Sequence, residues 1–275
     1  MFEFAGIDQR RERIVMPKLG INLSMLFTEI PMMERFSAAR NAGFNSIEIQ
    51  FPYEFDRKAI KQELQRNELE MILFNMHPGD VAAGDCGIAS LPSRVDEFRA
   101  TVQKAVDWAT DLGVSRLNCL AGKRVSSYSY EEQWETLVSN VRYAARILEQ
   151  NGIQLMIEPL NHYDVPGFLL NTPTQVLQLI NEVNSANVYL QYDIYHAQRE
   201  EGKLTETLRL NLAKIGHIQI ADNPGRHQPG TGEINYRYLL QEIDRSGYQG
   251  YVSLEYLPQP DTLTSLNWLK DLGIN

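Results

Sequence analysis

The chain of 275 residues is 43% hydrophobic and carries a formal net charge of −9, with a pI near 5.1. It can bury an ample core, either as one large α/β domain or as two smaller ones. Its acidity argues against a general electrostatic hold on nucleic acid or anionic membrane, because neutralising phosphates requires clustered Lys and Arg. It also has no run of about 18 apolar residues that would span a bilayer. We therefore expect a small-molecule partner, no nucleic acid and no membrane.

Residues 1–18 are predicted to be an N-terminal extension of the folded domain. They lack the apolar run and the small-residue cleavage site of a secretory signal. A basic targeting peptide is disfavoured because Glu3, Asp8 and Glu12 are mixed among its arginines. The two cysteines, Cys86 and Cys119, have no metal-type spacing and do not indicate a disulfide framework. A cytoplasmic location is therefore expected, and the sequence leaves open whether the chain forms a homo-oligomer.

From about residue 19 onward, short apolar runs alternate with longer segments of helical periodicity. The predicted strands lie near residues 19–24, 45–50, 71–76, 115–120, 153–158, 187–193, 216–220 and 251–255. The predicted helices occupy residues 31–42, 56–66, 93–112, 130–150, 173–183, 203–213, 236–245 and 262–272. Proline near the start of some helices and glycine after the end of others suit the usual helix caps.

These strand-then-helix units follow one another without a composition break or a linker. The pattern predicts an α/β fold, a single (β/α)8 TIM barrel over residues 19–275, rather than an open doubly wound sheet. The joins that lead from a strand to a helix are the long ones, above all residues 76–92 and 221–235. In such a barrel these joins lie on the catalytic face.

Four polar residues stand at or near the ends of the last four predicted strands: Glu158, Asp193, Gln219 and Glu255. Closure of the barrel would bring them around one point. Three carboxylates in one pocket cannot all stay ionised unless a positive charge lies among them, and a divalent cation would supply it. Carboxylate and amide oxygens are hard ligands, so Mg²⁺ or Mn²⁺ is predicted rather than zinc. Taken singly, each residue could also be an ordinary polar strand end.

Further polar residues at the same rim are candidates for contact with a substrate: His196, Arg226, Lys123, Asn75 and His77. His196 would donate to a substrate oxygen or support a metal ligand. Arg226 would fix an anionic or hydroxylated substrate, and Lys123 would pair with a substrate carboxylate. Alternatively, His196 is a capping or core histidine, the loop that carries Arg226 is purely structural, and Lys123 is a solvated surface lysine. Glu48 lies inside the second predicted strand, and His217 is expected to be structural, one layer below Gln219.

At these residues the chain resembles the hydroxypyruvate isomerase family, within the xylose-isomerase-like TIM barrels. The resemblance rests on seven ordered motifs, which together are far more specific than any one of them. They are NLSMLF at 22–27, FPY at 51–53, IEPLNH at 157–162, YDIYH at 192–196, HIQIAD at 217–222, PGTGEINY at 229–236 and EY at 255–256. The resemblance implies a metal held by Glu158, Asp193, Gln219 and Glu255. It also implies that Glu158 and Glu255 form the acid/base pair.

The implied reaction interconverts hydroxypyruvate and tartronate semialdehyde, with metal-assisted proton transfer through an enediolate. The same chemistry would serve a 2-oxo-tetronate isomerase or a ketose 3-epimerase, so the motifs alone do not separate these substrates. An endonuclease IV-like phosphodiesterase would need more histidines at strand ends for its several zinc ions. A non-catalytic binding protein is poorly supported, because both glutamates of the acid/base pair are present.

Overall fold

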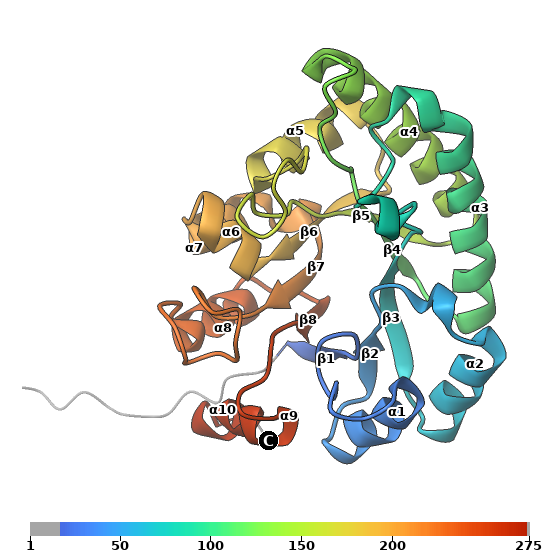
Figure 1. Cartoon of the computed structure of the whole chain (residues 1–275). Helices are drawn as coiled ribbons and strands as arrows, with labels where there is room; N and C mark the ends of the chain where they lie inside the picture. Colours follow the sequence, from blue (N-terminus) through green and yellow to red (C-terminus); the bar gives the residue numbers. More distant parts are fainter. Residues whose placement is uncertain (1–16, 274–275) are drawn as a thin grey trace, which may run out of the picture.

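The computed structural model describes residues 17–273, in which parallel strands close into a barrel and helices surround it (Figure 1). Each strand pairs with the next along the chain, and β8 closes the barrel by pairing with β1. The strands are β1 Lys18–Asn22, β2 Ser46–Glu48, β3 Glu70–Asn75, β4 Arg116–Cys119, β5 Gln154–Ile157, β6 Val188–Asp193, β7 Ile215–Ile220 and β8 Tyr251–Leu254. The predicted (β/α)8 barrel is therefore confirmed.

The helices run over the outside of the barrel and follow the predicted segments closely. They are α1 Met32–Asn41, α2 Arg57–Arg66, α3 Val95–Leu112, α4 Tyr130–Gln150, α5 Pro173–Val183, α6 Ile194–Glu200, α7 Leu204–Asn211, α8 Tyr236–Arg245, α9 Thr262–Ser265 and α10 Asn267–Asp271. Local sequence explains several starts: Ser129 and Thr172 form capping boxes with the residues three positions on. No helix within residues 17–273 is long and apolar enough to cross a membrane.

Two helical segments differ from the prediction. The sequence pattern gave no helix directly after β6, whereas α6 begins there because the Asp193 side chain accepts hydrogen bonds from the backbone N–H groups of Tyr195 and His196. The single helix predicted for residues 262–272 is two short helices that meet at Leu266. The predicted N-terminal extension lies, for residues 1–16, outside the described residues, and Lys18 already belongs to β1.

Strand register decides which side chains face the barrel interior. Gln191 pairs with His217 and Asp193 pairs with Gln219 across β6 and β7. Since side chains alternate along a strand, these four share the inner face, while Ile218 and its apolar neighbours pack against the helices. The inner face is thus polar near the carboxyl ends of the strands. That end of the barrel holds the candidate site.

Candidate active site

A cavity of about 240 Å³ opens at the carboxyl ends of the strands. The predicted site residues that line it are Asn75, Glu158, His196, Gln219, Arg226 and Glu255. Asp193 is 1% exposed and reaches the same region through its contacts with His196 and Arg226. Apolar side chains such as Phe51, Leu73 and Leu160 complete the wall. Residues from most strands of the barrel therefore meet at one point, as the strand-end pattern predicts.

Three carboxyl groups, those of Glu158, Asp193 and Glu255, are buried around this cavity. Burial raises the pKa of Glu158 well above its usual range, and the charges of Glu255 and Asp193 raise it further. Burial also raises the pKa of Asp193, against the opposing effect of Arg226. It raises the pKa of Glu255 to about 8, although Arg226 lowers it. The carboxyl groups therefore repel one another and favour a cation between them.

Arg226 is a cation that lies among these carboxyl groups. Its Nη2 is 3.6 Å from Asp193 Oδ2 and 3.6 Å from Glu255 Oε2. These distances are those of ion pairs without a direct hydrogen bond. The guanidinium also lies 5.1 Å from the ring centroid of Tyr195. Burial lowers the pKa of Arg226, but the surrounding carboxylates outweigh it and the net direction is upward.

The loop that carries Arg226 is held together by its own hydrogen bonds. The Asp222 carboxylate accepts from backbone N–H groups at both ends of the loop. The Arg226 carbonyl accepts from the N–H of Leu257 at 2.7 Å, and Arg226 itself has a φ of 54°. A Cβ added at Gly232 would lie 2.0 Å from the Asn223 carbonyl oxygen, so the loop requires glycine there. The backbone thus fixes where the guanidinium enters the cavity.

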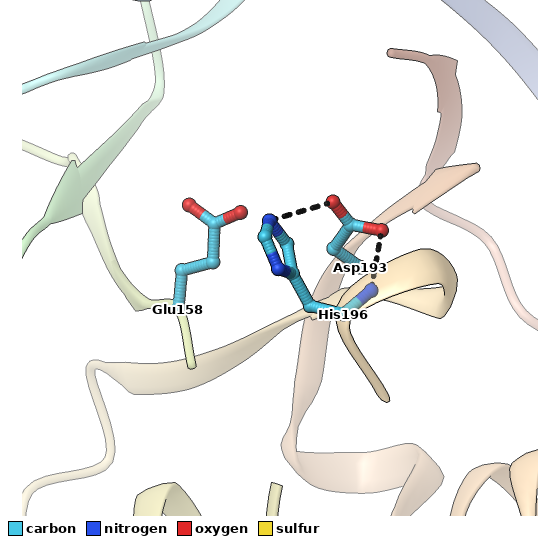
Figure 2. A group of neighbouring side chains, drawn as sticks. All are labelled: Glu158, Asp193 and His196. Atoms are coloured by element: carbon cyan, nitrogen blue, oxygen red, sulfur yellow. Dashed lines mark hydrogen bonds and ion pairs between the residues drawn. The ribbon is translucent and has the colours of Figure 1, made fainter. Parts of the chain in front are cut away.

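The donor set at the cavity fits a divalent cation. Within residues 17–273, the buried oxygens Asp193 Oδ2 and Glu255 Oε2 have no hydrogen-bond donor. Glu158, Asp193 and His196 each offer an atom within 4.8 Å of the other two, a group that could hold a metal ion. Figure 2 shows the His196 ring between the carboxylates of Glu158 and Asp193. Buried oxygens without a donor are costly, and a coordinated cation would offset that cost.

The hydrogen bonds of His196 fix the position of its proton. Nδ1 accepts from the backbone N–H of Asn161 at 3.0 Å. A ring nitrogen that accepts from a backbone N–H carries no proton, so a neutral ring has its proton on Nε2. Burial, with the charge of Arg226, lowers the pKa of His196 well below its usual range. Nε2, which lies 3.6 Å from Asp193 Oδ2, is therefore a hydrogen-bond donor directed into the site.

Two predicted contact residues lie away from the cavity lining. Lys123 Nζ donates to the carbonyl of Gly84 at 3.2 Å on the exposed surface. The His77 ring packs against Tyr53, with ring centroids 5.3 Å apart, and its Nδ1 accepts from the N–H of Gly79. Neither side chain is among those that line the cavity. Asn75, by contrast, lines the cavity.

The prediction missed three amides that hold the glutamates. Asn118 Nδ2 donates to Glu158 Oε2 at 2.7 Å. Gln50 Nε2 and Asn22 Nδ2 both donate to Glu255 Oε1. Each amide lies at or near the carboxyl end of a predicted strand, in the first half of the barrel. The positional argument used for the last four strands would have found them.

The raised pKa of Glu255 predicts how the metal-free protein responds to pH. The folded-state pKa is about 8, above the ordinary value of 4.5, so between these values the unfolded chain ionises Glu255 and the folded chain does not. The free energy of unfolding should therefore fall as pH rises from about 5 to 8, by up to about 1.4 kcal/mol per pH unit for this group. Urea unfolding in EDTA at several pH values would measure it.

The matched control for this measurement is Glu255→Gln, which has no carboxyl group to ionise and should show a shallower pH dependence. Added Mn²⁺ should stabilise the wild-type protein more at pH 8 than at pH 5.5, because the cation favours the ionised carboxylates. Equal pH slopes for the wild-type protein and the variant would contradict the expectation.

Comparison with known proteins places this geometry in a family. The model of the xylose isomerase-like TIM barrel matches residues 36–272. The chain belongs to the xylose isomerase-like TIM barrel family. Its relatives include hydroxypyruvate isomerase of Escherichia coli (strain K12), 48% identical over 254 residues, which span 92% of this chain and 98% of that protein. A 2-oxo-tetronate isomerase of Pectobacterium atrosepticum is 39% identical over 253 residues, which span 92% and 97%.

A solved structure of the family is also similar over nearly the whole chain. It is described as an AP endonuclease of family 2 from Brucella melitensis, with a TM-score of 0.91 at 39% identity, covering 93% of this chain and 99% of that chain. Family membership thus rests on the sequence and on the fold together. The two curated relatives quoted above are isomerases by name.

Proposed function

We propose that the protein is an isomerase that interconverts hydroxypyruvate and tartronate semialdehyde. The observation that carries the proposal is the pair of buried glutamates, Glu158 and Glu255, that face one cavity from β5 and β8. The 48% identity to hydroxypyruvate isomerase of E. coli supports the substrate. A cytoplasmic location is part of the proposal, and it is supported by the free thiols of Cys86 and Cys119.

The reaction moves two protons through an enediolate: one from the hydroxymethyl carbon of hydroxypyruvate to the neighbouring carbon, and one from the hydroxymethyl oxygen to the oxygen of the former ketone. We assign one glutamate as the base that removes the first proton and the other as the acid that protonates the neighbouring carbon. β5 and β8 are separated by β6 and β7, so Glu158 and Glu255 reach the cavity from different sides. Their pKa values are both raised, and a raised pKa suits a carboxyl group that must hold a proton and then deliver it to carbon.

We further propose that Glu158, Asp193, Gln219 and Glu255 hold a divalent cation, Mg²⁺ or Mn²⁺. The oxygens Asp193 Oδ2 and Glu255 Oε2, which accept no hydrogen bond, support this assignment, as does the hard-oxygen character of the donor set. When bound, the cation would supply Lewis-acid stabilisation of the negative charge on the enediolate oxygens. The proton on His196 Nε2 favours a role for this residue as a donor to the substrate rather than as a ligand.

Recognition of the substrate carboxylate is assigned to Arg226. Its guanidinium is half-buried at the cavity, and its ion-pair contacts with Asp193 and Glu255 are both 3.6 Å long. Its Nε has no hydrogen-bond acceptor within residues 17–273. Guanidinium groups bind carboxylates in a bidentate manner, which supports the assignment of Arg226 to this role. Apolar residues such as Leu160 and Val165 would keep water from the enediolate.

A second candidate substrate is a 2-oxo-tetronate, because a relative of that name is 39% identical over most of the chain. The cavity of about 240 Å³ is smaller than the roughly 300 to 1,000 Å³ usual for larger ligands. This size favours three- and four-carbon acids over a ketohexose. A multi-zinc phosphodiesterase is less well supported, since the described residues contain one group of three clustered metal-ligating side chains.

Proton NMR in D₂O tests the proposal directly. The purified protein with Mn²⁺ or Mg²⁺ is given hydroxypyruvate, a 2-oxo-tetronate and a ketohexose in separate samples, with EDTA-treated protein as the control. Conversion of hydroxypyruvate with deuterium uptake, faster than for the other two, is the expected result. Preferred conversion of the 2-oxo-tetronate would select the second candidate. No exchange into any of them, with Mn²⁺ bound, would reject the proposed isomerase.

A further inference from the structure

A chain of buried polar side chains lies directly beneath the proposed cation site. Glu48, on β2, is 0% exposed and accepts a hydrogen bond from Gln219 Nε2 at 2.9 Å. Its other carboxylate oxygen is paired with His217 Nε2. On the far side of the amide, Gln219 Oε1 accepts from Gln191 Nε2 at 2.7 Å. The Gln219 amide is thus bonded at both of its ends.

The two ends of this amide are not equivalent. A carboxylate can only accept hydrogen bonds, so Glu48 can bond the nitrogen of the Gln219 amide and would repel its oxygen. Glu48 also accepts from Asn22 Nδ2 at 3.4 Å, so its hydrogen bonds with Gln219, His217 and Asn22 all come from N–H donors. Reversing the Gln219 amide would place an oxygen against this carboxylate in a dry interior.

We propose that Glu48 is a positioning residue that fixes the orientation of the Gln219 amide, so that its oxygen and not its nitrogen is presented at the cavity. The inference rests on the proposed cation site. Gln219 and Gln191 line the cavity, whereas Glu48 lies below it. An amide oxygen has two lone pairs and Gln191 uses one of them, so the other stays available to a cation. The amide nitrogen has no lone pair to offer.

This orientation requires a dedicated residue because Gln219 is an amide. A carboxylate at the same place would present an oxygen whichever way it turned, whereas a glutamine presents an oxygen in one of two orientations. The partners of a metal ligand commonly change metal affinity by 10- to 100-fold when they are replaced. Glu48→Gln keeps the size of the side chain but, with its oxygen toward His217, turns its NH2 group toward Gln219 and favours the reversed amide, so Mn²⁺ affinity should fall by roughly that factor.

The inference is tested by introducing Glu48→Gln into the wild-type protein and into the Gln219→Glu variant. Mn²⁺ affinity is measured by electron paramagnetic resonance for the wild-type protein, Glu48→Gln, Gln219→Glu and the double variant. In the wild-type protein Gln219 donates and Glu48 accepts. In the double variant these roles are exchanged, because the amide at position 48 donates to the carboxylate at position 219 and can still accept from His217. Glu48→Gln should therefore weaken Mn²⁺ binding in the wild-type background but not in the Gln219→Glu background.

The melting temperatures of the metal-free proteins provide a readout that does not depend on the cation. Gln219→Glu alone should lower the melting temperature, because two buried carboxylates would then face each other, and adding Glu48→Gln should recover it. Equal Mn²⁺ affinity of the wild-type protein and Glu48→Gln would overturn the inference while leaving the proposed function intact. Absence of Mn²⁺ binding by the wild-type protein would overturn the proposed cation site and this inference with it.

Discussion

Replacing either Glu158 or Glu255 by Gln is expected to lower kcat for hydroxypyruvate isomerisation by roughly 100- to 10,000-fold, the usual contribution of a general acid or base. An amide keeps the shape and one oxygen of the carboxyl group but cannot remove or return a proton. Both side chains are buried at the same cavity, so water cannot readily replace either of them. Initial rates at saturating Mn²⁺, with the bound metal quantified for each variant, would measure the effect.

The two variants should differ in the exchange of substrate protons. The variant that lacks the acid of the second step can still remove the hydroxymethyl proton, so hydroxypyruvate takes up deuterium from D₂O without isomerising. The variant that lacks the base takes up none. Glu63→Gln is the matched control, because Glu63 lies on α2 and pairs with Arg66 at the surface. Retention of more than a tenth of the wild-type kcat by both catalytic-site variants would refute the assignment.

Arg226→Gln is expected to raise KM for hydroxypyruvate by roughly 10- to 100-fold, because a hydrogen bond to a charged group contributes about 1.5–3 kcal/mol. The variant retains a polar side chain but loses the charge that faces the substrate carboxylate. Its kcat should change less than its KM, since Arg226 is assigned to binding rather than to proton transfer. Steady-state kinetics over a wide range of hydroxypyruvate concentration would separate the two parameters.

Lys123→Ala is the matched control for the loss of a positive charge. Lys123 is half-buried, its Nζ is bonded to the Gly84 carbonyl and its side chain does not line the cavity, so its removal should leave KM unchanged. An increase of KM in Lys123→Ala equal to that in Arg226→Gln would show that overall charge, and not a specific contact, attracts the substrate. An unchanged KM in Arg226→Gln would remove Arg226 from the assigned role.

The sequence was sufficient to predict the barrel because its strands and helices differ in period and length. Runs such as residues 187–193 are short for a helix and contain the valine and tyrosines that strands favour, and they recur at intervals that a βα unit fills. The rule that chemistry lies at the carboxyl ends of barrel strands then located Glu158, Asp193, Gln219 and Glu255 around one cavity. These inferences depend on chain order alone, which a single sequence contains.

What could not be predicted depends on side-chain direction within the loops. His77 and Lys123 follow strand ends just as His196 and Arg226 do, yet neither lines the cavity. Beyond the last strand residue the alternation of side chains no longer applies, so sequence position does not determine direction. His196 faces the site because Asp193 caps the start of α6, and that short helix has too few residues to show a period.

The loop closed by Asp222 has a consequence for redesign. Its internal hydrogen bonds run between its own residues, and the glutamates assigned to proton transfer belong to strand ends elsewhere in the barrel. Residues 221–235 can therefore be treated as an exchangeable segment, provided that Asp222 and Gly232 are kept and that the hydrogen bonds to residues 257–259 are preserved. Grafting this segment between relatives should transfer the preference for a longer or shorter acid while leaving the proton-transfer chemistry in place.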